Sequence, residues 1–185
     1  MIDELLQDAR EHMAKSVDAT RHKFNSVRTG RATPSLLDRI HVDYYGAVTP
    51  LRQLAQVHAP EPRLLTIQPY DKSSIKAIER AILESDLGLT PNNDGQVVRL
   101  QIPEMTEERR REMVKVARGV AEEGRVAIRN IRRDVMHDLR ELRDSGEAGS
   151  DDEHRAEEAL QKLTDEKIAD VDAALKAKEA EILEV

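Results

Sequence analysis

The sequence has no cysteine and no tryptophan, and aromatic residues make up only 2% of it. The lack of cysteine excludes disulfides, thiol nucleophiles and thiolate metal ligands, and it suits a reducing compartment. No apolar run approaches the roughly 20 residues that a membrane-spanning helix needs. The acidic, amphipathic start at residues 1–6 is unlike a secretory signal or a transit peptide. We therefore expect a cytoplasmic protein that does not bind membranes.

Motifs of the common enzyme classes are also missing. The sequence contains no glycine-rich phosphate loop ending in Lys-Ser/Thr, no nucleophile elbow and no His-Glu-x-x-His pair. The histidines are isolated and lack the spacing of metal ligands. They are His12, His22, His41, His58, His137 and His154. We expect neither an enzyme nor a bound metal or cofactor.

Apolar residues recur three and four positions apart in both end regions, which predicts amphipathic helices. A first helix should start at Ile2 and end near residues 28–30, where Gly30 can cap it. A second should begin after Thr106, because its apolar positions advance 29 residues in eight steps, about 3.6 per turn. A third should follow the break at 146–149, with Ser150-Asp151-Asp152-Glu153 as its capping box. Three such helices can bury their apolar faces only against one another, which predicts a three-helix bundle.

The middle of the chain has a different period. Apolar residues alternate at 40–44 and 98–102, and short strand-like runs cover 54–59 and 63–68. One helix is expected over 74–85, and turns are expected at 60–62 and 91–95. We predict a small α+β domain, residues 31–104, inserted into a bundle made of residues 1–30 and 105–185. The two connections, Arg31-Ala32-Thr33-Pro34 and Ile102-Pro103-Glu104, are the expected hinge.

Charge is unevenly distributed along the chain. The net charge is −7, yet residues 106–145 sum to +2 whereas residues 146–185 sum to −8. On a helical wheel most arginines of the second predicted helix fall on one flank and most acids on the other. That flank contains Arg111, Arg118, Arg125, Arg129, Arg132, Arg140 and Arg143. Guanidinium groups suit phosphate oxygens, but such a flank can equally be a solvated face paired with acids of neighbouring helices.

If the arginine flank binds RNA, the contacts should be to phosphate, sugar and shape, because aromatic residues for base stacking are scarce. Binding of that kind weakens as salt rises. The alternative from the residues alone is a helical scaffold or chaperone-like adaptor that binds proteins through its bundle.

Several stretches spread along the whole chain are similar to signature stretches of ribosome recycling factors. They are Val27-Arg28-Thr29-Gly30-Arg31-Ala32, Asp43-Tyr44-Tyr45-Gly46, Ser85-Asp86-Leu87-Gly88, Thr106-Glu107-Glu108-Arg109-Arg110 and Ile128-Arg129-Asn130-Ile131-Arg132-Arg133-Asp134. The resemblance implies an L-shaped α+β protein, a long three-helix bundle with an inserted β/α/β domain. It also implies a monomer that needs no cofactor.

The function implied by this resemblance is disassembly of the ribosome that stays on messenger RNA after termination, together with elongation factor G. The bundle would contact large-subunit ribosomal RNA, and the inserted domain would meet elongation factor G. The arginine matching Arg132 is expected to be central to RNA binding. The other expected RNA-binding residues are Arg28, Arg31, Arg125, Arg129 and Arg133.

Overall fold

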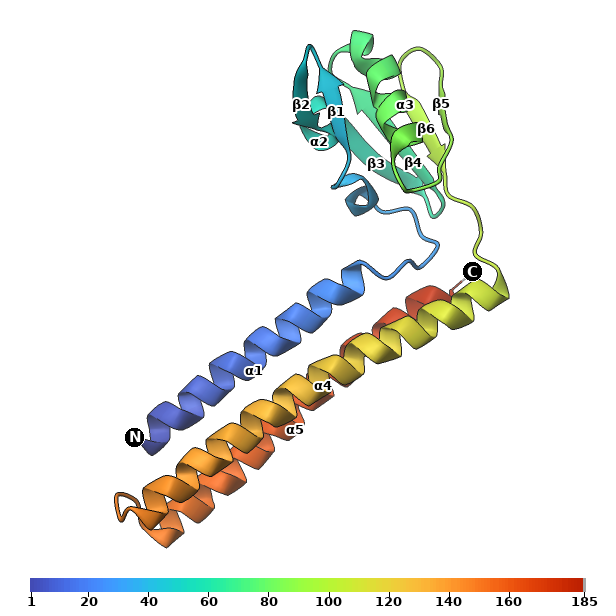
Figure 1. Ribbon diagram of the computed structural model, residues 1–185. Coiled ribbons are helices and arrows are strands. Elements are labelled where there is room, and N and C mark those ends of the chain that lie inside the picture. Colours follow the sequence, from blue (N-terminus) through green and yellow to red (C-terminus); the bar gives the residue numbers. More distant parts are fainter. Residues whose placement is uncertain (185) are drawn as a thin grey trace. The chain divides into compact units, whose positions relative to one another are not determined.

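The computed structural model of the chain describes residues 1–184 and divides them into two compact units. Residues 1–29 and the segment from residue 107 onward form the larger unit, and residues 30–106 form the smaller one (Figure 1). Val185, the last residue of the predicted bundle, lies outside the described residues.

The larger unit is a bundle of three helices, as predicted: α1 (Ile2–Asn25), α4 (Glu107–Asp144) and α5 (Ser150–Leu183). Each helix packs on the other two. Figure 1 shows α4 and α5 side by side and antiparallel, joined by a short connector at one end of the bundle. The buried residues recur at helical spacing, so each helix turns one face inward. They include Ala9, Met13, Val17, Phe24, Ala117, Ala121, Ile128, Leu139, Leu160, Leu163 and Val171.

One predicted helix end and one predicted helix cap are wrong. Helix α1 ends at Asn25, before the predicted stop near 28–30, because the Ser26 hydroxyl and the Val27 N–H donate to the last carbonyls of the helix at 2.7 and 3.0 Å. The capping box of α5 is also wrong. Gly149 is its N-cap, no side chain caps it, and the buried Glu153 instead accepts a hydrogen bond from Arg143 Nη1 at 3.2 Å.

Helices α1 and α4 come close at Gly124. A Cβ atom built on Gly124 would overlap Oγ1 of Thr20, a buried α1 residue whose hydroxyl donates to the Ser16 carbonyl at 2.8 Å. The space for a side chain at this level of the bundle is therefore taken by Thr20. Ala121, one turn earlier in α4, is also fully buried.

The smaller unit has two antiparallel sheets, the first formed by β1 (His41–Tyr44) and β2 (Ala47–Pro50). The second sheet has the order β3-β4-β6-β5. Its strands are β3 (Ala55–Glu61), β4 (Leu64–Pro69), β5 (Pro91–Asn93) and β6 (Val98–Gln101). The helices are η1 (Pro34–Leu37), α2 (Leu51–Leu54), η2 (Lys72–Ser74) and α3 (Ile75–Glu84). The buried isoleucines of α3 share a core with alternate residues of β4 and β6.

Residues 91–95, predicted as a turn, are only partly one. Pro91–Asn93 is the edge strand β5, with Pro91 opposite Leu100 of β6. An edge strand tolerates proline because one side of its backbone needs no partner. Strand β3 likewise extends to Glu61, which pairs with Leu64, so the turn predicted at 60–62 is tighter than expected. Of the two neighbouring tyrosines, Tyr44 at the end of β1 is half-buried and Tyr45 is exposed.

Asp94 organises the turn between β5 and β6, and this makes the turn sensitive to acid. Its carboxylate accepts hydrogen bonds from the backbone N–H groups of Val97 and Gln96 at 2.8 and 2.9 Å and from Arg99 at 3.0 Å. The two backbone bonds, and then Arg99, lower the pKa of Asp94 from 3.8 to about 2. Because the pKa is lower in the folded state, these bonds stabilise the turn above pH 3.8, and their contribution is lost as pH falls through about 2.

We expect amide hydrogen exchange at Gln96 and Val97 to accelerate relative to other sheet amides as pH falls from about 4 to about 2. An asparagine in place of Asp94 keeps a side-chain oxygen but cannot titrate, so Asp94→Asn should abolish that pH-dependent component. The same pH profile in both proteins would show that Asp94 does not control the turn.

Candidate functional site

The predicted arginine flank of α4 faces α5, and much of it is already paired with carboxylates there. Arg118 Nε donates to Glu179 at 2.8 Å and Arg125 Nη2 lies 2.7 Å from Asp172. Toward the connector, Arg140 lies 3.6 Å from Glu157. For these arginines, the alternative of a face paired with a neighbouring helix is correct.

Carboxylate partners raise the pKa of two of the paired arginines, which keeps them charged. The hydrogen bond to Asp172, followed by that to Glu122, raises the pKa of Arg125. Hydrogen bonding to Asp144 and the charge of Glu153 raise the pKa of Arg143. Arg125, a predicted RNA contact, thus has two carboxylate partners, and its side chain is only 20% exposed. Its role in RNA binding stays a prediction.

Arg132 differs from its neighbours on the flank. It is half-buried, and its Nη1 donates to the neutral oxygen Oε1 of Gln161 at 2.6 Å. Its Nε is buried and is the one such side-chain atom in residues 1–184 without a hydrogen-bond partner. Leaving a buried donor unpaired costs about 1–3 kcal/mol. Because this arginine on the predicted RNA-binding flank has an unsatisfied buried donor, we take its position as the centre of the candidate site.

Arg129 and Arg133 extend the site along α4 as exposed side chains. Their nearest carboxylates are Glu122, 3.6 Å from Arg129, and Asp134, 3.8 Å from Arg133. Both distances are too long for a hydrogen bond, and exposed ion pairs of this kind contribute little. We call residues 129–133 the arginine window, because their guanidinium groups are the least neutralised on this stretch of α4.

Arg28 and Arg31 do not belong to the arginine window. Arg28 lies after α1 in the larger unit, is exposed and forms no hydrogen bond or ion pair with the described residues. Arg31 is exposed and belongs to the smaller unit. The preceding Gly30 has φ +77°, and its Cα packs beside the Met105 side chain. The positive φ explains why glycine occupies this position.

The structure narrows the predicted hinge. Ala32 and Ile102 are buried in the core of the smaller unit, and their N–H groups donate to the carbonyls of Pro62 and Arg63, both at 2.7 Å. These two residues are therefore part of a folded unit rather than of a tether. Thr33 is the N-cap of η1 and Pro34 its first residue, and Glu104 forms an ion pair with Arg63 at 3.0 Å. A hinge that uses Arg31, Pro103 and Glu104 stays a prediction.

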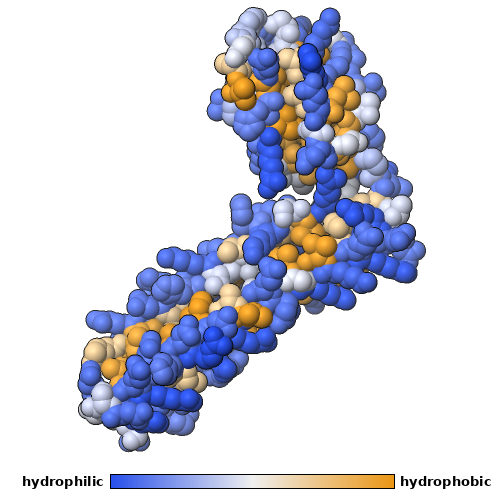
Figure 2. Space-filling view, in the orientation of Figure 1, coloured by the Kyte–Doolittle hydropathy of each residue, from blue (hydrophilic) through white to orange (hydrophobic). Residues whose placement is uncertain are grey.

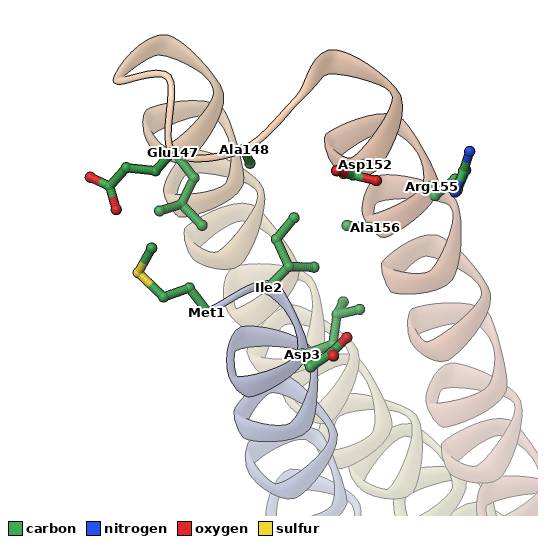
Figure 3. A pocket seen from close by; sticks show the side chains of 10 residues that line it. Met1, Ile2, Asp3, Glu147, Ala148, Asp152, Arg155 and Ala156 are labelled. Carbon is green, nitrogen blue, oxygen red and sulfur yellow. The ribbon is translucent and has the colours of Figure 1, made fainter.

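A pocket of about 470 Å³ lies at the end of the bundle where α1 begins (Figure 3). Met1 and Ile2 line it together with Leu142 and Ala148, and the charged residues Asp152 and Arg155 lie on its α5 side. None of these charged groups is buried, so the pocket lacks the fixed polar groups of a small-molecule site. In residues 1–184 no cluster of three or more histidines or acids could hold a metal ion, and no helix is apolar enough over a sufficient length to cross a membrane.

Comparison with known proteins assigns the family. The model of the family described as ribosome recycling factor matches residues 20–183. The ribosome-recycling factor of Rubrobacter xylanophilus is 58% identical over 180 residues, which cover 97% of each chain. That of Carboxydothermus hydrogenoformans is 53% identical over 185 residues, all of both chains. The chain belongs to the ribosome recycling factor family.

Solved ribosome recycling factors also share its fold. A solution structure of a ribosome recycling factor matches with a TM-score of 0.77 and 37% identity, covering 100% of this chain and 98% of that one. The Thermus thermophilus factor, described with Escherichia coli elongation factor G bound to the E. coli post-termination complex, matches with a TM-score of 0.66 and 48% identity over 99% of both chains.

The sequence did not predict one residue of the candidate site, Gln161. The sequence signal that could have pointed to this region is a spacing of seven residues on both helices. It relates Arg118, Arg125 and Arg132 on α4, and Glu179, Asp172 and Asp165 on α5. The two series can be matched only when the register of the antiparallel helices is known. Figure 2 shows that the bundle surface is mostly hydrophilic in this view, with apolar residues in several patches along it.

Proposed function

We propose that this chain binds the ribosome left on messenger RNA after termination and, together with elongation factor G, disassembles it. The observation that carries the proposal is full-length similarity to ribosome recycling factors, 58% identity over 97% of the chain in one case. A relative 48% identical to it is described on the post-termination complex with elongation factor G. The protein would work as a monomer in the cytoplasm, without a cofactor and without catalysing a reaction.

The larger unit would contact large-subunit ribosomal RNA through the arginine window and Arg28. Two features support this choice: the window is weakly neutralised by carboxylates, and Arg28 has no partner in the described residues. The guanidinium groups would bind phosphate oxygens, because the chain has few aromatic residues that could stack on bases. The smaller unit would meet elongation factor G.

Ribosome pelleting across a salt series tests the proposed function. We expect the logarithm of the affinity to fall roughly linearly with the logarithm of the salt concentration, by about one unit of slope per arginine–phosphate contact. Elongation factor G and GTP should then cause the bound ribosomes to separate into subunits, measured by light scattering. A protein that ignores ribosomes and co-purifies with a protein partner would instead be the scaffold or adaptor.

A further inference from the structure

The charge pairing between α4 and α5 follows a regular pattern that is interrupted at one place. Arg118 pairs with Glu179 and, seven residues further along α4, Arg125 pairs with Asp172, seven residues earlier in α5. We call this series the α4–α5 charge ladder. The next step of seven on each helix matches Arg132 with Asp165. These two residues do not form an ion pair.

Gln161 interrupts the ladder by bonding to both residues of this third step. Its Oε1 accepts from Arg132 Nη1 at 2.6 Å, and its Nε2 donates to Asp165 Oδ1 at 2.9 Å. The direction of the amide is fixed by chemistry, since arginine can only donate and an ionised aspartate can only accept. The carboxamide therefore takes the place of a carboxylate beside Arg132 and occupies the Asp165 oxygen at the same time.

The consequence is an arginine that is held in position but keeps its charge. Nε of Arg132 is buried and Nη1 is bound to Gln161, so the guanidinium group cannot turn freely. Nη2 has no partner in the described residues and is not buried. A fixed, un-neutralised guanidinium group with an accessible Nη2 suits a charge-assisted hydrogen bond to a phosphate oxygen.

We propose that Gln161 is a positioning residue for ribosomal RNA binding, which holds Arg132 away from Asp165 so that the guanidinium charge stays available to a phosphate. The inference rests on the proposed function, because it concerns the same RNA contact. At Arg118 and Arg125, a phosphate of RNA would have to compete with an α5 carboxylate for the guanidinium group. At Arg132 it would not.

The first test replaces Gln161 with glutamate in the full-length protein. Gln161→Glu keeps the length and the acceptor but puts a carboxylate against Arg132, which completes the ladder. We expect the affinity for purified bacterial ribosomes to fall about tenfold and the salt slope to decrease by about one unit, as for loss of one phosphate contact. Thermal stability should not fall.

Ala169→Glu is the matched control, because it adds one acid on the exposed face of α5. Residue 169 lies four positions after Asp165, as Gln161 lies four before it, so both variants create the same like-charge spacing on the helix. We expect the control to bind ribosomes nearly as the wild type does. An equal loss in both variants would mean that the added charge repels RNA from anywhere on α5, and would overturn the inference.

A double-mutant cycle separates the inference from the proposed function. If Gln161 acts through Arg132, then Gln161→Glu should have almost no further effect on binding in an Arg132→Ala background. A full additional loss there would contradict the positioning role. If Arg132→Ala alone binds as the wild type does, the RNA contact itself fails. If Arg132→Ala binds weakly but Gln161→Glu binds normally, only the positioning role fails.

A second variant tests the shielding of Asp165 without adding charge. Gln161→Ala removes the carboxamide, so Asp165 is free to pair with Arg132 and ribosome affinity should fall. Adding Asp165→Asn to that variant removes the competing carboxylate and should recover part of the affinity. No loss in Gln161→Ala, or no recovery in the double variant, would contradict the shielding.

Discussion

Arg132→Ala should lower ribosome affinity about tenfold or more, since a hydrogen bond to a charged group contributes about 1.5–3 kcal/mol. It should leave the bundle folded. The variant loses the bond to Gln161, but it also removes a buried Nε that has no partner, and the two effects on stability are opposite in sign. Ribosome pelleting and thermal unfolding followed by circular dichroism measure the two quantities separately.

Arg118→Ala is the matched control for Arg132→Ala. It removes the same charge from the same helix, but at a position where Glu179 already neutralises the arginine at 2.8 Å. We expect its ribosome affinity to change much less, and its salt slope to stay close to that of the wild type. Equal losses in the two variants would mean that RNA responds to the overall charge of α4 and not to Arg132.

Gly124→Ala should destabilise the bundle although alanine is the better helix former. The added methyl group would overlap Thr20 Oγ1, and overpacking of a close helix contact costs about 1–3 kcal/mol. The gain in helix propensity offsets up to about 1 kcal/mol of this. We therefore expect a net loss of up to about 2 kcal/mol in the free energy of unfolding, measured by urea denaturation of the helical signal.

Gly119→Ala is the matched control for this prediction, because no atom lies within 4 Å of a Cβ added there. Only the propensity gain applies at this exposed position, so the variant should be stabilised by up to about 1 kcal/mol. Adding Thr20→Ala to Gly124→Ala should recover part of the loss by clearing the space. If both glycine variants are stabilised alike, the α1–α4 contact at Gly124 is looser than its geometry indicates.

The larger unit follows closely from the period of its apolar residues. The spacing of the apolar residues predicted three helices packed as a bundle, because each amphipathic helix must bury its apolar face against the others. Local hydrogen bonds changed two details: α1 ends a few residues early beside the Ser26 hydroxyl, and Glu153 accepts from Arg143 and does not cap α5, which still begins at Ser150. Where a helix ends and what caps it depend on hydrogen-bond partners that lie only one turn apart. The period of the apolar residues does not distinguish between such partners.

The smaller unit was harder to predict because its strands are short. Pro91–Asn93 contains a proline and two asparagines, which locally favour a turn, yet it pairs with β6 as an edge strand. Pairing depends on the partner strand, and the partner lies beyond the residues that determine local propensity. The same reasoning applies to Ala32 and Ile102, which precede a proline by two residues and by one residue but are buried in the core of this unit.

The order of residues was sufficient to locate the arginines on one flank of α4 and to indicate that phosphate is a fitting ligand for them. It could not tell which of them are neutralised, because the register between α4 and α5 arises only when the two helices pack. Packing pairs Arg118 and Arg125 with acids of α5 and puts the amide of Gln161 beside Arg132. Charge is thus encoded residue by residue, whereas its availability depends on neighbours that are distant in sequence and close in space.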